Sequence, residues 1–188
     1  MMETKHSKHT NQVRICGGVL CGRKLTFNNA PSLRPTPEMV REKLFNWLGQ
    51  DLTGQNVLDL FSGSGALGFE AASRHAKQVW MCDNHRPSVK LLQQHVKQFN
   101  LTDNVYITCQ DAFTYLKHHT ETFDLVLLDP PFMWQEWATL FKLLKNKLNP
   151  NAFVYLEVGK LPLLPEWLNI YRQGKAGKSQ FILANYTS

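Results

Sequence analysis

Short apolar segments alternate with longer amphipathic ones along residues 56–158, and this alternation restricts the fold class. The apolar segments read as strands and span 56–61, 78–83, 104–109, 123–129 and 152–158. Segments with helical character span 65–75, 87–100, 111–119 and 137–148. Near-continuous apolar strands separated by helices are typical of βαβ units, whose parallel strands are covered on both faces. We therefore predict an α/β fold with a doubly wound, mostly parallel sheet.

The two ends of the chain depart from this alternation. Residues 167–186 read as two strands around the turn sequence GKAGKS, and they leave no room for a crossover helix, so we expect an antiparallel C-terminal hairpin. Residues 13–30 read as a smaller N-terminal β-hairpin with glycines at its bend. A helix should follow, because Thr36 can cap it and Pro37 suits its first position. Its apolar stripe comprises Val40, Leu44, Trp47 and Leu48.

The length and composition indicate a single compact domain over residues 1–188. Hydrophobic residues make up 43% and charged residues 19% of the chain, which is ordinary for a globular protein. Within the domain we expect a disordered basic tail (1–12), the hairpin extension (13–30) and a core (36–188). No apolar run reaches the roughly 18 to 20 residues that cross a bilayer, and the first residues lack the apolar segment of a signal peptide. We therefore expect a cytoplasmic protein that has no membrane partner. Separately, we expect a monomer.

The four cysteines and seven histidines show no spacing typical of metal ligands. The cysteines form no CxxC pair and lie in or beside expected strands, so we expect buried, reduced thiols. No metal site is expected.

The whole chain has a formal net charge of +6, and basic residues are concentrated near its N-terminus. Residues 1–24 contain one acidic residue, Glu3, and the basic residues Lys5, Lys8, Arg14, Arg23 and Lys24. Such a segment is either a solvated tail or a basic handle for a polyanion such as nucleic acid, whose phosphates attract Lys and Arg irrespective of sequence.

Acidic residues follow several of the predicted strands. Ligands of doubly wound sheets bind beyond the carboxyl ends of the strands. The first strand carries Asp59 and leads into Gly63, Gly65 and Gly68, the second ends in Asp83, and the third leads into Asp111. The fourth ends in the sequence Asp129, Pro130, Pro131, Phe132. We expect the four acids to converge on one cleft, although Asp111 could equally be a helix cap.

The glycine-rich turn alone does not identify its ligand. Residues 63–68 match the GxGxxG pattern of dinucleotide-binding turns, and Asp83 lies where an acid would hold ribose hydroxyls. However, Asp59 would repel a pyrophosphate, whereas it would attract the ammonium and sulfonium groups of S-adenosylmethionine. A nicotinamide oxidoreductase is therefore disfavoured.

The sequence DPPF at 129–132 suits methylation of an amino group on a nucleobase. The lone pair of such a nitrogen is delocalised into the ring, so the site must favour a tetrahedral nitrogen. Asp129 can accept one N–H and the Pro130 carbonyl, freed by the rigid Pro130–Pro131 bend, can accept the other. Phe132 offers a face for base stacking, a contact worth on the order of 1–3 kcal/mol. The residues thus indicate amino-group methylation.

These motifs resemble class I S-adenosylmethionine-dependent methyltransferases. VRICGG, GRKL, LRPTPEMVREKLFNWL and RQGKAGKSQFIL more closely resemble the RsmD family, which methylates a guanine N2 in bacterial 16S ribosomal RNA, and the resemblance extends from Val13 to Tyr186. It implies a Rossmann-like core with a seven-stranded sheet, and a substrate that is either free ribosomal RNA or an assembled 30S subunit.

The resemblance also implies a role for each matching residue. Asp59, Gly63 and Gly65 would line the methionine end of S-adenosylmethionine, Asp83 would bind its ribose, and Asp111 with the Ala112 amide would hold its adenine. Asp129, Pro130, Pro131 and Phe132 would form the catalytic amino-group site, with Arg34 and Thr36 beside it. Arg14, Arg23 and Lys24 remain candidates for RNA contacts.

Other functions remain open at this point. A DNA adenine-N6 or cytosine-N4 methyltransferase would share the DPPF chemistry but would normally need a sizeable target-recognition domain. A protein glutamine methyltransferase more often has Asn where Asp129 stands. A non-catalytic ribosome-assembly protein could also have a basic N-terminal segment, but it would tolerate loss of DPPF, so the intact motif argues against it.

Overall fold

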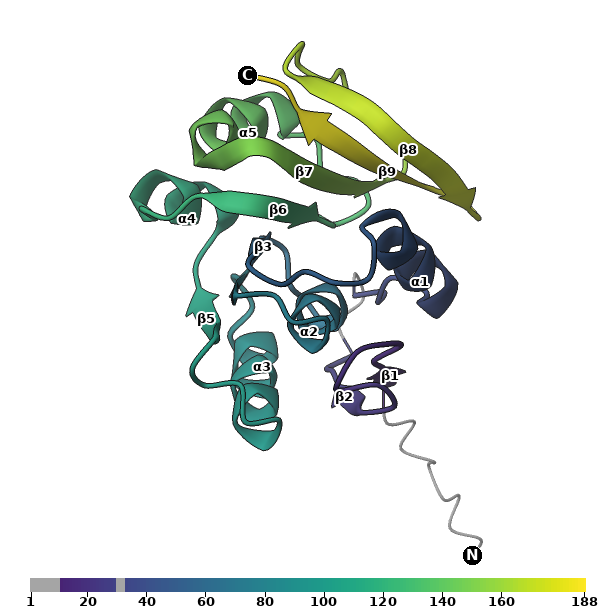
Figure 1. Ribbon diagram of the computed structural model, residues 1–188, viewed down its shortest axis with the longest axis vertical. Helices are drawn as coiled ribbons and strands as arrows, with labels where there is room; N and C mark the ends of the chain where they lie inside the picture. The colour runs from purple at the N-terminus through teal and green to yellow at the C-terminus, as the bar shows by residue number, and fades with distance from the viewer. Residues whose placement is uncertain (1–10, 30–32) are drawn as a thin grey trace, which may run out of the picture.

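The computed structural model describes residues 11–29 and 33–188. Its main sheet contains seven strands in the spatial order β5, β4, β3, β6, β7, β9, β8, and Figure 1 shows this sheet running through the molecule. The strands are β3 (Asn56–Asp59), β4 (Gln78–Asp83), β5 (Val105–Cys109), β6 (Phe123–Leu128), β7 (Leu148–Val158), β8 (Leu168–Ala176) and β9 (Ser179–Tyr186). Strands β3 to β7 are parallel, whereas β9 is antiparallel to β7 and β8. The predicted α/β fold with a doubly wound, mostly parallel sheet and a C-terminal antiparallel hairpin is confirmed.

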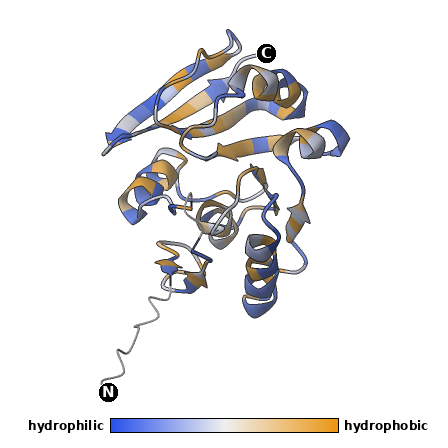
Figure 2. Ribbon diagram, turned by 180° about the vertical axis from the view of Figure 1, so that it is seen from behind, coloured by the Kyte–Doolittle hydropathy of each residue, from blue (hydrophilic) through white to orange (hydrophobic). Residues whose placement is uncertain are grey.

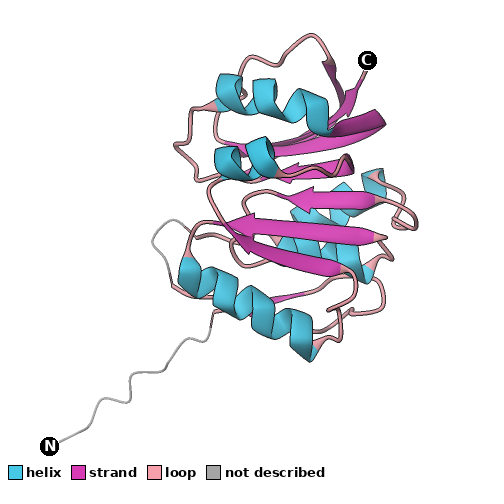
Figure 3. Ribbon diagram, turned by 90° about the vertical axis from the view of Figure 1, so that its left-hand side faces the viewer, coloured by secondary structure: helices cyan, strands magenta, loops and turns pink. Residues whose placement is uncertain are grey.

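Helices cover both faces of the sheet, as Figure 3 shows from the side. On one face lie α1 (Glu38–Trp47), α2 (Ala66–Ser73) and α3 (Arg86–Gln98), and on the other lie α4 (Ala112–His118) and α5 (Trp137–Leu144). Each face has its own apolar core, because alternate strand residues point to opposite sides. Figure 2 shows the apolar colouring concentrated in the central strands. Within the described ranges, no helix is long and apolar enough to cross a membrane.

The strand order reverses between β3 and β6. The chain proceeds from β3 outward through β4 and β5, and it then returns to the other side of β3 with β6. In doubly wound sheets, this switch point opens a crevice at the carboxyl ends of the two strands. Asp59 ends β3 and Asp129 follows β6, so the fold places both acids at the switch point.

Two expected boundaries are wrong. The helical segment expected to end at residue 148 ends as α5 at Leu144, and a short 3₁₀ helix, η1 (Lys145–Lys147), follows. Leu148 instead begins β7, because it is buried and pairs with Phe123 of β6. In the C-terminal hairpin, the strands extend into GKAGKS and leave Gly177 and Lys178 as the turn, where the φ of +58° at Gly177 suits glycine.

The small N-terminal hairpin is present. Strands β1 (Gln12–Arg14) and β2 (Lys24–Thr26) pair antiparallel, with Val13 opposite Leu25. Residues 1–10 of the expected tail and residue 30 of the expected hairpin lie outside the described residues. Gln12 belongs to β1 rather than to a disordered tail, because it pairs with Thr26. Cysteine burial is also partly mispredicted, since the described thiols are free but only Cys82 is buried, with Cys21 and Cys109 exposed.

The buried face of α1 differs from the predicted stripe. Val40 and Leu44 are buried as expected, but Trp47 and Leu48 are only partly buried, and Arg41 and Phe45 fill the core instead. Arg41 is 1% exposed, which an arginine tolerates only when it is paired. The buried face of α1 is therefore determined in part by an ion pair of Arg41, which the pattern of apolar residues does not reveal.

The partner of Arg41 is Glu70 of α2, which is fully buried. Oε1 of Glu70 accepts the Arg41 guanidinium at 2.8 Å and the Cys16 backbone N–H at 2.6 Å, while Oε2 binds Arg74. Arg41 also donates to the Arg14 carbonyl at 2.8 Å and to the Thr36 carbonyl at 3.0 Å. We call Glu70, Arg41 and Arg74 the ionic cluster. It ties the N-terminal hairpin, the loop before α1 and the helix after the glycine turn to one point.

Removing the central charge should destabilise the protein strongly. Glu70→Gln would leave two buried guanidinium groups without their carboxylate, so we expect the free energy of unfolding in urea to fall by about 3–5 kcal/mol. Glu38→Gln, which breaks the exposed Arg14–Glu38 pair, is the matched control and should change stability little. Similar losses in the two variants would show that the ionic cluster does not hold these segments together.

Candidate active site

Asp59 is a buried acid with one free oxygen. Its Oδ2 accepts the Gly68 backbone N–H at 3.0 Å, and its Oδ1 is buried with no hydrogen-bond partner among the described residues. Burial, and to a lesser degree the nearby Asp83, raises the pKa of Asp59 to about 7. An unpaired buried carboxylate oxygen is unfavourable unless a ligand donates to it. Asp59 therefore suits a ligand that carries a cation or an N–H group.

The turn after β3 requires its glycines. Gly63 and Gly65 have φ angles of +51° and +81°, a region that other residues rarely adopt. A Cβ on Gly65 would also lie 2.5 Å from Leu92 Cδ2. Asp83 closes the turn, because its Oδ2 accepts the Gly63 N–H at 2.8 Å and its Oδ1 accepts the His85 N–H at 2.8 Å. A carboxylate has about four lone-pair sites, so Asp83 can still accept hydroxyl groups.

Asp111 caps a helix. Its Oδ1 accepts the Thr114 N–H at 2.9 Å at the start of α4, and Ala112 is the first residue of that helix. The sequence left open whether Asp111 faces the shared cleft or caps a helix, and the structure shows the cap. A hollow of about 530 Å³ adjoins Asp111 at the carboxyl ends of β4 and β5 and is lined by Asn84, Arg86, Val89, Lys90, Gln93, Cys109 and Gln110.

Asp129 belongs to a cluster that joins three segments. The Thr36 hydroxyl lies 3.1 Å from Oδ2 of Asp129 and 2.8 Å from Oε2 of Glu157. Tyr155 donates its hydroxyl to the same Oε2 at 3.2 Å. Burial and the neighbouring Glu157 raise the pKa of Asp129 well above its ordinary value, and burial raises the pKa of Glu157 as well. We call Thr36, Asp129, Tyr155 and Glu157 the carboxyl cluster.

The register of the sheet explains this cluster. In the parallel pair β6–β7, Leu127 lies beside Tyr155 and Leu128 beside Leu156, so the next neighbours are Asp129 and Glu157. Alternation along the strands directs Tyr155 and Glu157 to the face covered by α1 and α2. Asp59 is near enough to contribute to the raised pKa of Asp129. The acids from neighbouring strand ends are thus brought to one edge, in the order Asp111, Asp83, Asp59, Asp129, Glu157.

Two features of the carboxyl cluster differ from expectation. Thr36 does not cap α1, which has no side-chain cap, because the Thr36 hydroxyl binds the two carboxyl groups instead. The motifs do not single out Glu157. Its position in the apolar strand sequence AFVYLEV is a usable signal, because an acid within a buried strand is costly unless it has a role.

The segment after Asp129 presents an aromatic ring. Phe132 is 57% exposed and packs on Gly159, where an added Cβ would lie 2.5 Å from the Phe132 Cζ. The Pro131 carbonyl accepts the Trp134 N–H at 2.8 Å, whereas no hydrogen bond to the Pro130 carbonyl is found among the described residues. Trp134 packs edge-on against Phe61 at 5.4 Å between ring centroids. The segment is therefore anchored at Trp134, while the Phe132 ring remains exposed.

The predicted RNA-binding cations do not all have the same surroundings. Arg23, Lys24 and Arg34 are exposed, and the Arg23 guanidinium lies 6.0 Å from the centre of the Phe99 ring. Arg14 is exposed too, but it forms an ion pair with Glu38 at 2.6 Å. Within the described part of the chain, Arg14 is thus the one of these cations that an acid neutralises. Thr36 is buried and belongs to the carboxyl cluster rather than to an exposed surface.

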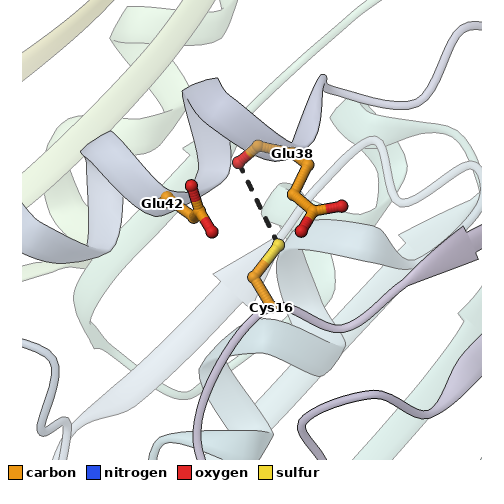
Figure 4. A group of neighbouring side chains, drawn as sticks. All are labelled: Cys16, Glu38 and Glu42. Carbon is orange, nitrogen blue, oxygen red and sulfur yellow. Dashed lines mark hydrogen bonds between the residues drawn. The ribbon is translucent and has the colours of Figure 1, made fainter.

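One group resembles a metal site in composition. Cys16, Glu38 and Glu42 bring possible ligand atoms within 4.8 Å of one another. Figure 4 shows these three side chains. However, the Glu38 carboxylate is paired with Arg14, and the Cys16 thiol points toward the Glu38 carbonyl at 4.0 Å. Burial raises the pKa of Cys16 to about 12, which keeps the thiol protonated. These contacts account for the group as part of the α1 packing.

The raised pKa of Asp59 predicts how stability depends on pH. An unfolded aspartate titrates near pH 3.9 or so, whereas the folded chain holds the Asp59 proton up to about pH 7. The folded state binds this proton more tightly, so its stabilising effect is complete below about pH 4 and is lost as the pH rises through about 7. Between about pH 5.5 and about pH 8, the free energy of unfolding should fall more in the wild type than in Asp59→Asn. Equal pH dependence in urea titrations would contradict the assignment.

Comparisons with known proteins agree with these features. A family model described as "Conserved hypothetical protein 95" matches residues 13–185. The Haemophilus influenzae protein named "Ribosomal RNA small subunit methyltransferase D" is 36% identical over 183 residues, covering 94% of each chain. The Escherichia coli K12 protein of the same name is 33% identical over 188 residues, covering 97% of this chain and 94% of the relative.

Solved structures show the same architecture. The Escherichia coli protein yhhF superposes with a TM-score of 0.85 at 30% identity, covering 94% of this chain and 98% of that one. A Thermus thermophilus 16S rRNA N2 G1207 methyltransferase, solved with AdoMet and guanosine, superposes with a TM-score of 0.70 at 22% identity over 95% of this chain and 50% of that one, which supports the fold alone. By sequence match along nearly its whole length, the chain belongs to the RsmD family of S-adenosylmethionine-dependent methyltransferases.

Proposed function

We propose that this protein transfers a methyl group from S-adenosylmethionine to the exocyclic N2 amino group of a guanine in bacterial 16S ribosomal RNA. The observation that carries the proposal is the meeting of two features at the switch point. The glycine turn lies at the end of β3 beside Oδ1 of Asp59, which has no hydrogen-bond partner among the residues described, and the DPPF segment lies at the end of the adjacent strand β6. The named relatives act on small-subunit ribosomal RNA and cover nearly all of this chain.

The residues around the glycine turn fit S-adenosylmethionine. The free oxygen of Asp59 would accept the ammonium group of its methionine end, and Gly63 and Gly65 would allow close approach of the backbone. Asp83 would bind the ribose with the lone pairs left by its two backbone hydrogen bonds. Asp111, with the Ala112 amide, would hold the adenine beside the hollow. When bound, the cofactor supplies a methyl group on a positively charged sulfur.

The DPPF segment would position the guanine. Asp129 would accept one hydrogen of the amino group, and the Pro130 carbonyl, which has no partner among the described residues, would accept the other. Both acceptors would lie outside the plane of the base and would direct the nitrogen lone pair toward the methyl group. Phe132, exposed and resting on Gly159, would stack on the base. Positioning and fixed charges then lower the barrier without a strong base.

The substrate would be held by the N-terminal hairpin and by Arg34, next to the carboxyl cluster. Arg23, Lys24 and Arg34 are exposed cations and would contact phosphates. We further propose that the enzyme acts as a monomer in the cytoplasm, on free ribosomal RNA or on an assembled 30S subunit. Nothing in residues 11–29 and 33–188 favours the DNA or protein substrates that the sequence left open.

The proposal is tested by incubating the protein and labelled S-adenosylmethionine with 16S RNA or 30S subunits from cells that lack the enzyme. The label should appear in N2-methylguanosine at one position of the RNA. Comparison of free RNA with subunits identifies the form of the substrate. Label in adenosine or cytidine, or none in either RNA, would refute the proposal.

Asp129→Ala should abolish methyl transfer while S-adenosylmethionine affinity stays within a few-fold, because Asp129 contacts the amino group rather than the cofactor. Single-turnover assays and calorimetry measure the two effects separately. Asp103→Asn, an exposed acid in a turn, is the control and should behave like the wild type. Retained turnover in Asp129→Ala would exclude the acceptor role.

The exposed cations Arg23 and Lys24 of the hairpin should determine the salt dependence of RNA binding. Arg23→Gln combined with Lys24→Gln should weaken binding and reduce the slope of log affinity against log salt by roughly 1.4–1.8, as for two lost phosphate contacts. Arg14→Gln should have a smaller effect, because Glu38 already neutralises Arg14. Lys142→Gln with Lys145→Gln, two exposed lysines in α5 and η1 on the other face of the sheet, is the matched control. An unchanged slope in the hairpin variant would exclude the hairpin as the RNA contact.

A further inference from the structure

The carboxyl cluster contains more close contacts than its hydroxyl hydrogens can make. Three oxygen pairs lie within hydrogen-bond distance: Thr36 with Asp129, Thr36 with Glu157, and Tyr155 with Glu157. Thr36 and Tyr155 provide one hydroxyl hydrogen each. If both carboxyl groups were ionised, one contact of Thr36 would join two oxygens with no hydrogen between them. A third hydrogen, carried by Asp129 or Glu157, completes all three bonds.

The protein fixes this geometry from both sides. The β6–β7 register continues past the Leu128–Leu156 pair to place Asp129 beside Glu157, so the backbones of the two acids stay adjacent while these strands are paired. Thr36 is 2% exposed, and its carbonyl accepts Arg41, which is itself held by Glu70. The Thr36 hydroxyl is therefore held between the two acids by the ionic cluster.

We propose that Glu157 is a positioning residue that takes up the proton of this pair when substrate binds and, through the Thr36 hydroxyl, leaves Asp129 ionised as the acceptor for the amino group. The inference rests on the proposed function, because it assigns Asp129 to the amino group. Two neighbouring acids that contact the same hydroxyl group can share one proton in this way, and a donor to one of them shifts the proton to the other.

The proton movement balances without any added reagent. When the substrate amino group donates to Asp129, the O–H bond of Asp129 breaks and its proton passes to Oγ1 of Thr36. The Thr36 hydrogen passes at the same time to Oε2 of Glu157, so the net charge of the pair stays at minus one. After the methyl group has reached the nitrogen, the N–H bond breaks, its electron pair returns to nitrogen, and the proton goes to Asp129.

The surrounding groups support a shared proton. Asp59, at the end of β3, adds negative charge on the Asp129 side. Tyr155, on β7, has its pKa raised well above its ordinary value by burial and the two acids, so it remains a donor to Glu157. From the loop before α1, the hydroxyl of Thr36 faces the pair, and behind it Arg41 binds the Thr36 carbonyl. Lys160, which is exposed, lines the same small hollow as Glu157.

The first test does not depend on methyl transfer. In the full-length protein labelled at carboxyl carbons, the Asp129 and Glu157 resonances are assigned with Asp129→Asn and Glu157→Gln and titrated by NMR. The wild-type pair should carry one proton at neutral pH and titrate in two coupled steps. In Glu157→Gln, Asp129 should titrate in one step at a pKa about one unit or more lower, because the neighbouring charge is gone. Two fully ionised carboxyl groups at neutral pH would overturn the inference.

The second test is the pH profile of kcat/KM on 16S RNA. The acid limb of this profile is its low-pH side, where activity falls as Asp129 becomes protonated. Thr36→Val removes the donor to Asp129, so the acid limb of this variant should move to higher pH. Its activity at neutral pH should be about 10- to 100-fold lower and should recover as the pH rises. Thr36→Ser should restore the wild-type profile. Glu157→Gln should move the acid limb to lower pH, because the neutral amide mimics the protonated acid.

These outcomes separate the alternatives. A purely structural role would lower activity without moving the acid limb, and loss of activity at every pH in Glu157→Gln would make Glu157 an ionised base. Either result would overturn the inference. Absence of methyl transfer by the wild type would instead refute the proposed function, while the NMR titration would still decide whether the pair holds a proton.

Discussion

The buried carboxylate of Glu70 fixes the position of segments that are far apart in sequence. It accepts Arg41, Arg74 and the Cys16 backbone, and Arg41 in turn holds the carbonyls of Arg14 and Thr36. Each ion in this cluster pays a desolvation cost, so the cluster contributes less to net stability than its short contacts suggest. Its effect is on geometry, because breaking any one pair leaves a buried charge. This cluster therefore fixes the relative positions of the N-terminal hairpin, the loop before α1 and the helix after the glycine turn. As a result, the Thr36 hydroxyl lies within hydrogen-bond distance of Asp129.

The period of the strands determines which acids meet. Side chains alternate between faces, so Asp59 on β3 and Tyr155 and Glu157 on β7 point toward the side of α1 and α2, and Asp129 joins them one residue beyond β6. A shift of β7 by one residue would send Glu157 to the other core and replace it with Leu156 or Val158. The apolar residues that set the register of the sheet thereby also set the distance between the two acids. Core packing and site geometry are consequences of the same register.

Much of the fold could be predicted because its signals are local. The alternation of strands and helices, the glycine turn after Asp59 and the missing crossover near the C-terminus each depend on a short stretch of sequence, and the family resemblance added the number of strands. Thr36, Arg41 and Glu157 could not be placed in this way. Thr36 has the local pattern of a helix cap, yet its hydroxyl binds partners 93 and 121 residues away. Arg41 looks like a surface residue until its partner, 29 residues later, is known to be buried. In each case a buried polar partner distant in sequence overrides the local propensity. Such a partner cannot be predicted from the spacing of residues within a short segment.

The buried acids at the switch point lower the stability of the folded protein when no ligand is bound. Burial raises the pKa values of Asp59, Asp129 and Glu157, which means that the folded chain disfavours their ionised forms. A cationic ligand beside Asp59 and N–H donors beside Asp129 would replace lost water contacts, so part of the binding energy would be used to relieve this strain. Ligands that bind only the folded state stabilise it by mass action. A chain with this arrangement would gain stability when a cation and an N–H donor bind at adjacent strand ends, and ligands of the same shape that lack these groups cannot supply that gain.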